Sequence, residues 1–262
     1  MTFFELRGEN TNLVKTLICV IGMICFLIVW HLLPTYNLIP NSILPSPINV
    51  ITSIHDMYLN DDLFNHIKFS LTLNFLGYIE AITISLIFGF IVGLFPLFRG
   101  LFEKPIATFR FLPLSAMTGI FIAWFGIDTP MKIQFLAFGI FVYMIPVVIQ
   151  RIDEVQQVYI DTVNTLGAGK WQTIKTVFIP DVLSRFFDDI RVLTAISWTY
   201  IIIAEMINKT SGLGALTFIA QRQSRTDKLY AVLFIIMMIG FFQDQIFKLI
   251  DRFLFRFKYK AE

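Results

Sequence analysis

The residue types that could do chemistry in this chain are concentrated in a short polar interval, residues 161–180. Within it, Gly167-Ala168-Gly169-Lys170 resembles the end of the glycine-rich loop that wraps nucleotide phosphates. That loop also needs a glycine five residues before its second glycine, and a serine or threonine after the lysine. The chain has Asn164 and Trp171 at those positions, and no strand precedes the interval. We therefore expect no nucleotide to bind here and no catalytic residue in the chain.

Composition indicates a membrane protein. Of the 262 residues, 56% are hydrophobic and 15% are charged, whereas soluble domains carry about 25% charged residues. The first apolar run is followed by His31-Leu32-Leu33-Pro34 without a small-residue cleavage pattern, so we expect this run to be a retained span. Cys19 and Cys25 both lie inside it, which argues against a disulfide framework and against a metal site. We expect an all-α membrane protein that binds no metal and no cofactor of its own.

The apolar runs predict six transmembrane helices in a single domain, residues 12–250, between a short leader, 1–11, and a basic tail, 251–262. A surface helix is expected at 48–59, in the first connector, and a polar segment with Arg222, Arg225 and Lys228 after the loop 211–214. The expected spans are 12–33, 69–98, 113–125, 131–149, 180–207 and 230–250.

The second span carries two features of its own. As one helix it would be roughly 45 Å long, against a hydrocarbon core of about 30 Å, so it must tilt or protrude. Gly89 and Gly93 on it form a small-xxx-small pair that allows close helix contact. We expect a basic turn with Arg99, Lys104 and Arg110 directly after it.

Charge distribution predicts the orientation. With the N-terminus in the cytosol, thirteen of the Lys and Arg residues fall on inner segments and six on outer ones, with Arg185 and Arg191 inside the fifth span left uncounted. An excess of positive charge on the cytosolic side is the normal pattern. Both termini and the polar interval are therefore expected in the cytosol of a bacterial cell, with the spans in its plasma membrane.

The polar interval and the residues before it have the pattern of two short helices, from about 155 to 180. Apolar residues recur at helical spacing on one face, opposite Gln157, Asp161 and Asn164, and Gly167 with Gly169 interrupts the helix. The predicted apolar positions are Val155, Val158, Tyr159, Val163 and Leu166, followed by Trp171, Ile174, Val177 and Phe178. Pro180 is expected to begin the fifth span. From pattern alone, an amphipathic connector resting on lipid headgroups fits equally well.

This interval resembles the "EAA" loop of ABC-importer permeases. That loop has an acid, two small residues, a glycine after three more residues, and an apolar-x-apolar-Pro ending nine residues later. The chain departs from it by having Asp for Glu and Thr-Val for Ala-Ala. The matching residues are Asp161, Thr162, Val163, Gly167 and Val177-Phe178-Ile179-Pro180.

An ordered series of further motifs is similar to the nitrate/taurine/aliphatic-sulfonate permeases. The departures from that family are Asn74, Gly119, Ser184 and Asp189. The matching positions are Leu44-Pro45-Ser46-Pro47, Gly77, Gly89, Gly93, Leu112-Pro113, Trp124-Phe125-Gly126, Arg191, Ala204-Glu205, Ser211-Gly212-Leu213-Gly214 and Asp244.

The resemblance implies a six-helix type I (MetI-like) permease fold and a homodimer. It also implies two cytosolic ATPase subunits that hold the ATP, an extracytoplasmic solute-binding protein, and no nucleic acid. Asp161 would face the ATPase, Gly167 would set the angle between the short helices, and Trp171 with Ile174 would pack in the ATPase groove or against the bundle. The rest of the implied coupling loop is Thr162, Val163, Ala168 and Pro180.

Charged and aromatic residues inside the spans are the remaining candidates. Glu205, Trp198 and Tyr200 could form a substrate path or gate, or could serve packing and helix pairing. For Glu80 and Asp244 helix pairing is the favoured reading. For the charges at the start of the fifth span we favour ion pairs within the helix; they are Arg185, Asp188, Asp189 and Arg191.

Two rivals to an importer permease are an ion-gradient-driven transporter or channel and a membrane scaffold. The first predicts inverted repeats and broken helices around membrane acids, and no convincing repeat is visible in the sequence. The solute stays open among nitrate, bicarbonate, sulfonates such as taurine, and vitamin-precursor heterocycles.

Overall fold

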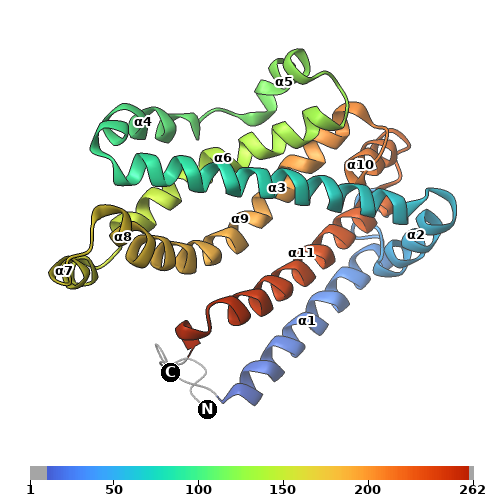
Figure 1. The fold of residues 1–262 in the computed structure, drawn as a ribbon. Coiled ribbons are helices and arrows are strands. Elements are labelled where there is room, and N and C mark those ends of the chain that lie inside the picture. Colours follow the sequence, from blue (N-terminus) through green and yellow to red (C-terminus); the bar gives the residue numbers. More distant parts are fainter. Residues whose placement is uncertain (1–10, 260–262) are drawn as a thin grey trace. The chain divides into compact units, whose positions relative to one another are not determined.

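The computed structural model describes residues 11–259, and in this range the regular structure is helical (Figure 1). Most of the expected leader and residues 260–262 lie outside the described residues. The expected all-α class is thereby confirmed. The helices are α1 (Asn12–Thr35), α2 (Pro47–Asn60), α3 (Leu63–Leu94), α4 (Pro96–Phe109), α5 (Thr118–Phe125), α6 (Thr129–Asp153), α7 (Gln157–Thr165), α8 (Lys170–Thr173), α9 (Ile179–Asn208), α10 (Leu213–Arg222) and α11 (Thr226–Leu254).

Five of these helices are long and apolar enough to cross a membrane, namely α1, α3, α6, α11 and the continuous stretch Lys170–Asn208. The sixth expected span is a bent pair: α4 and the segment Leu114–Phe125 meet at 96°. The prediction of a single third helix at 113–125 was therefore wrong, because α5 has only eight residues. The expected basic turn with Arg99 and Lys104 is also wrong, since both residues lie inside α4.

Three further differences concern helix ends. The segment after Gly212 forms α10, where the sequence suggested only a polar loop. Pro180 does not separate two helices, because a π-helical turn, Ile174–Phe178, joins α8 to α9 without a break. Proline has no backbone N–H to donate, and a π-turn lets a helix continue past the hydrogen bond that is missing there. The expected tail begins inside α11, which continues to Leu254.

The chain divides into two compact units. The first contains Met1–Asp62 with Ile219–Phe234, and the second contains Leu63–Phe218 with Ile235–Glu262. In the first unit, α1 is exposed along its apolar length, and Ser46 caps α2 by accepting a hydrogen bond from the Asn49 amide.

Acids and bases of the first unit pair with one another. Lys228 contacts Asp56 at 3.0 Å and Asp61 at 2.5 Å, and Arg225 binds Asp227 at 2.7 Å. The Asn60 amide that donates to Asp56 and the Lys228 ammonium lower the pKa of Asp56. Acids of the first connector therefore neutralise Lys228, and Asp227 at the start of α11 neutralises Arg225.

In the second unit, α3, α6 and α9 form the core, and close contact of α3 with α6 depends on small residues. A Cβ added at Gly89 would lie 2.5 Å from Val148, and one at Gly93 would lie 2.6 Å from Ile152. A Cβ added at Gly77 would lie 2.9 Å from Leu136. Atoms cannot approach so closely, so the predicted small-residue contact is confirmed, and its partner helix is α6.

We expect Gly89→Leu to destabilise the protein by about 1–3 kcal/mol, because the new side chain must displace Val148 from a packed helix interface. The measurement is the thermal unfolding midpoint of the detergent-solubilised protein. Gly100→Leu is the matched control, since a Cβ at Gly100 in α4 meets open space. Equal unfolding midpoints for the two variants would contradict the proposed packing.

Candidate functional site

The loop around Gly167 is built as a sharp turn between α7 and α8. Gly167 has a φ of +83° and nothing within 4 Å of its Cβ position, so its requirement for glycine comes from the backbone alone. The turn is closed by hydrogen bonds from the Gly167 amide to the Asn164 carbonyl at 2.9 Å and from the Ala168 amide to the Val163 carbonyl at 3.0 Å. At the start of α8, the Gly169 amide donates to the side chain of Gln172 at 2.7 Å.

Several large apolar side chains on this helix–turn–helix are exposed. Leu166 is 82% exposed and Trp171 is 65% exposed. Val158 and Tyr159 on α7 are about half exposed, whereas Val155 is buried. Trp171 contacts Lys175, whose ammonium lies 5.4 Å from the ring centroid. Packing of Trp171 against the bundle, one of the two expectations for it, is therefore wrong.

The other residues predicted for this loop occupy three settings. Asp161 is exposed on α7 and accepts a hydrogen bond from Gln157 at 2.9 Å. Ile174 and Ala168 are partly buried. Thr162, Val163 and Pro180 line a cleft of 380 Å³, together with Tyr159, Thr176, Val177 and Asp181.

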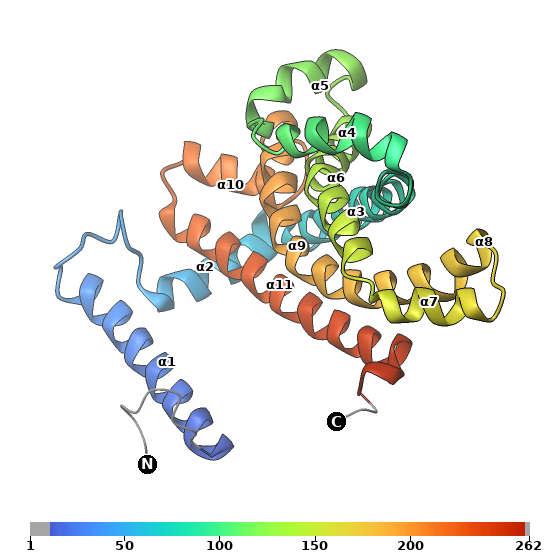
Figure 2. The ribbon, with the colours of Figure 1, turned by 90° about the vertical axis from the view of Figure 1, so that its left-hand side faces the viewer.

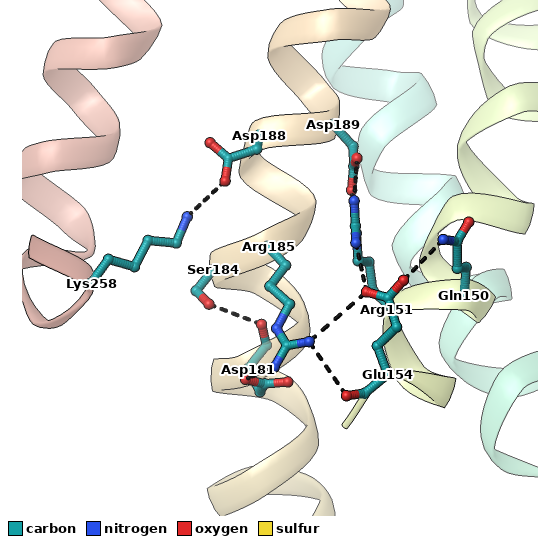
Figure 3. Close-up of polar contacts among 9 residues, drawn as sticks. All are labelled: Gln150, Arg151, Glu154, Asp181, Ser184, Arg185, Asp188, Asp189 and Lys258. Atoms are coloured by element: carbon teal, nitrogen blue, oxygen red, sulfur yellow. Dashed lines mark hydrogen bonds and ion pairs between the residues drawn. The ribbon is translucent and has the colours of Figure 1, made fainter. Parts of the chain in front are cut away.

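An ionic cluster joins the ends of α6 and α9 beside this loop (Figure 3). Arg151 binds Asp189 through two hydrogen bonds of 2.7 Å, and also contacts Glu154 at 2.5 Å. The guanidinium of Arg151 lowers the pKa of Glu154. Arg185 binds Asp181 at 3.1 Å and the Glu154 carbonyl at 3.3 Å.

The sequence analysis predicted ion pairs within one helix for these charges and did not identify their partners on other helices. Pairs within the helix exist for Arg185 with Asp181 and for Arg191 with Asp188. The shorter contacts cross between helices: Asp189 binds Arg151, and Arg191 binds Asp244 at 3.0 Å. Arg151, at the end of the fourth span, was the residue in the sequence that could have indicated a partner for Asp189.

Two membrane acids pair helices, as expected. Glu80 on α3 accepts from Gln134 on α6 at 2.8 and 3.0 Å. Asp244 on α11 binds Arg191 on α9 and Lys248 one turn further along its own helix.

Glu205 is fully buried and holds the turn that leads into α10. Its carboxylate accepts from the Ser70 hydroxyl at 2.6 Å and from the Gly214 amide at 2.8 Å. Gly212 has a φ of +104°, and a Cβ there would overlap the Glu205 carboxylate at 2.1 Å. These contacts tie α3, α9 and α10 together.

We expect Glu205→Ala to destabilise the protein strongly. It leaves the buried Ser70 hydroxyl and Gly214 amide without an acceptor, at a cost of about 1–3 kcal/mol for each group. Thermal unfolding of the solubilised protein measures this, with Glu205→Gln, which keeps one acceptor, as an intermediate case. A variant of normal stability with a changed KM for solute would instead indicate direct contact of Glu205 with the solute.

The two aromatic candidates lie in different surroundings. Trp198 is buried, and its indole N–H donates to the Gln243 side-chain carbonyl on α11 at 2.9 Å. Gln243 and Asn74 line a groove of 580 Å³ between α3 and α11. Tyr200 instead packs against the cluster of Leu114, Phe121 and Phe135 near α5.

Comparison with known proteins gives three kinds of likeness. The family model described as "binding-protein-dependent transport system inner membrane component" matches residues 81–256. The chain is 26% identical over 237 residues to the putative aliphatic sulfonates transport permease protein SsuC of Bacillus subtilis, covering 89% of this chain and 85% of that protein. It is 29% identical to the taurine transport system permease protein TauC of Escherichia coli, covering 84% and 82%.

Solved structures show the same fold. An inward-facing MetNI methionine ABC transporter chain superimposes with a TM-score of 0.64 at 17% identity, covering 72% of this chain and 94% of that one. A chain of a bacterial ABC transporter for alginate import gives 0.63 at 13% identity, covering 92% and 97%. The expected MetI-like permease architecture is confirmed.

Proposed function

Since the chain belongs to the binding-protein-dependent inner-membrane components of ABC transporters, we propose that it couples to a separate ATPase through α7 and α8. The chain is a multi-pass inner-membrane transport subunit of the sulfonate/taurine type, and ATP is hydrolysed by its partner. The proposal adds the surface through which the two proteins interact.

The exposed apolar side chains of this helix–turn–helix are the observation that carries the proposal. Leu166 and Trp171 lie at its turn and on α8, with little cover from the rest of the chain. Large exposed apolar side chains grouped on one element mark an interaction site. Asp161 adds a carboxylate to the same helix, facing solvent, so the surface has an apolar centre and a polar edge.

The helix–turn–helix is placed to move the membrane helices. α7 lies across the end of the bundle, and it is seen nearly end-on in Figure 1 and side-on in Figure 2. It follows α6 directly, and α8 continues into α9. Because Arg151 and Asp189 bind α6 to α9, a displacement of the loop acts on both helices together. When two ATPase subunits close on ATP, the pair of helices would tilt, which is the step required for alternating access.

We propose that the solute is an organosulfonate. We also propose that Trp198 borders the solute path by orienting the side chain of Gln243. The relatives named for aliphatic sulfonates and taurine support this class. The indole N–H of Trp198 is a donor only, so it fixes the Gln243 carbonyl and leaves the amide N–H group to the groove. Sulfonate oxygens accept hydrogen bonds from such donors. Tyr200 and Glu205 would not contact the solute but would support its path, through packing and helix pairing.

The remaining partners follow from the family. A solute-binding protein outside the membrane would deliver the solute, and a second copy of the chain would complete the path. We also propose that both termini face the cytosol. The thirteen Lys and Arg residues on the inner segments, against six on the outer ones, support this orientation.

Uptake of labelled taurine into proteoliposomes containing the permease, its ATPase and its binding protein tests the function. We expect uptake to require ATP and all three proteins, and to persist when ionophores dissipate ion gradients. Uptake that stops with the ionophore and continues without ATP would show an ion-gradient-driven transporter instead.

A further inference from the structure

The third span is broken between α4 and α5, and the break lies level with the middle of α6. At the start of α4, Arg99 binds Asp153, the last residue of α6, at 2.6 Å. Beyond the break, Leu114 packs against the middle of α6, where a Cβ added at Gly139 would lie 2.5 Å from it. α4 therefore runs back along α6, and the segment 110–113 reaches the depth at which a spanning helix is surrounded by hydrocarbon.

The segment 110–113 is not covered by the rest of the chain. It follows α4 in Figure 1, is not helical, and all of its residues are exposed. Phe111 is 83% exposed and Leu112 is 47% exposed. At membrane depth, non-helical backbone occurs only where protein buries it or where it borders a water-filled cavity. Since this chain does not bury the segment, either a second copy or water must cover it.

The side chain of Arg110 favours water. Arg110 is exposed, and its guanidinium has no hydrogen bond or ion pair with the residues that the structure describes, 11–259. Arg99 on the same helix, by contrast, binds both Glu103 and Asp153. Burial of an unpaired cation costs a large free energy, and charged side chains within a membrane normally face a partner or a wet cavity. The break therefore presents the N–H donors of an arginine to such a cavity.

We propose that Arg110 binds the sulfonate group of the solute as it passes the break in the third span. A guanidinium has paired N–H donors that match the oxygens of an oxyanion, and Phe111 and Leu112 beside it offer apolar surface to the carbon chain. This inference rests on the proposed function, which supplies the organosulfonate. Arg110 then belongs to neither face of the membrane, and twelve inner basic residues against six outer ones still give the same orientation.

Thiol labelling at Phe111→Cys tests the cavity and its preference for anions. The variant is made in a chain with Cys19→Ala and Cys25→Ala, and is studied with its ATPase in lipid nanodiscs. The probes are two water-soluble methanethiosulfonates, one with an ethylsulfonate group and one with an ethyltrimethylammonium group. We expect both to react, with the sulfonate reagent favoured at least about threefold relative to 2-mercaptoethanol, because Arg110 attracts it. Adding Arg110→Gln should remove this preference.

Thr83→Cys is the control for depth. Gly77 and Gly89 on α3 pack against α6 on either side of its middle, and Thr83 lies between them. Thr83 is exposed on a continuous helix, which lipid can cover, so we expect little reaction there. No reaction at Phe111→Cys would overturn the inference, since lipid or the second copy would then cover the break. Equal reaction rates at the two positions would also overturn it.

Uptake of labelled taurine into proteoliposomes with the ATPase and the binding protein tests the role of Arg110 in transport. Arg110→Gln should lower the maximal rate at least about tenfold, since the sulfonate loses a charged donor. Arg110→Lys keeps the charge without the paired donors, and its rate should fall between the two. Lys104→Gln, at an exposed base inside α4, should leave the rate unchanged. Equal rates for Arg110→Gln and Lys104→Gln would contradict the inference.

Failure of the inference can be told from failure of the proposed function. Normal taurine uptake by the unaltered permease and by Arg110→Gln would overturn the anion site and leave the proposed function intact. No taurine uptake by the unaltered permease, with the preference for the sulfonate reagent retained, would overturn the sulfonate as solute and leave an anion site at the break. Loss of both uptake and preference would overturn both.

Discussion

Gly167→Val should lower ATP-driven uptake at least about tenfold while the permease remains inserted and folded. A β-branched residue at a φ of +83° costs about 1–2 kcal/mol or changes the backbone. The chain would relieve this strain by changing the angle between α7 and α8, because no neighbouring atom packs against the Cβ position. Uptake per permease in proteoliposomes measures the effect, with protein quantity and monodispersity as checks on insertion.

Gly167→Asn is the matched control, since asparagine adopts positive φ values readily. Nothing lies within 4 Å of the Cβ position, so the added Cβ meets no atoms of the permease. We expect Gly167→Asn to retain most of the uptake. Equal loss in both variants would place the cause in side-chain contact with a partner instead of in the turn.

Arg151→Ala should separate ATPase binding from transport. The substitution removes the ion pair that links α6 to α9 and leaves Asp189 without this partner. The side chains of Arg151 and Asp189 are only about one-quarter and one-fifth exposed. We expect uptake to fall roughly tenfold, whereas the Kd for the ATPase changes less than about threefold, because Arg151 lies behind the docking surface. ATP hydrolysis that continues without uptake would be the direct sign of uncoupling.

Two further variants define this effect. Arg151→Ala combined with Asp189→Ala should be no worse than Arg151→Ala alone, since the two residues act as a pair. Arg99→Ala removes an arginine that binds Asp153 from α4 and does not touch α9, so its effect on coupling should be smaller. Additive losses for Arg151 and Asp189 would mean that they do not act through one another.

Much of the fold could be predicted because lipid imposes simple rules on a sequence. Runs of apolar residues gave five spans, and the spacing of Gly89 and Gly93 identified a close helix contact. The turn at Gly167 could be predicted because glycine adopts positive φ angles without strain. These features depend on the residues of a single segment.

Features that depend on a distant neighbour could not be predicted. Asp189 had a plausible partner three or four residues away, yet it binds Arg151 on another helix. The stretch after Pro96 was predicted as a basic turn, and the sequence did not show that it forms α4, bent by 96° from Leu114–Phe125. The cleft lined by α7 and the start of α9 arises only when these segments pack side by side, so it had no signal in the sequence.

Binding of the ATPase to surface variants of the helix–turn–helix tests the central claim most directly. Leu166 and Trp171 are largely exposed and bury little surface within the chain, so Leu166→Asp and Trp171→Asp should leave the permease folded. If they anchor the ATPase, each should weaken its binding by about 2 kcal/mol, close to a thirtyfold rise in Kd. Leu38→Asp, at an exposed apolar position in the connector between α1 and α2 and outside the spans, is the control. Unchanged affinity in both loop variants would contradict the account and favour an amphipathic connector that rests on lipid.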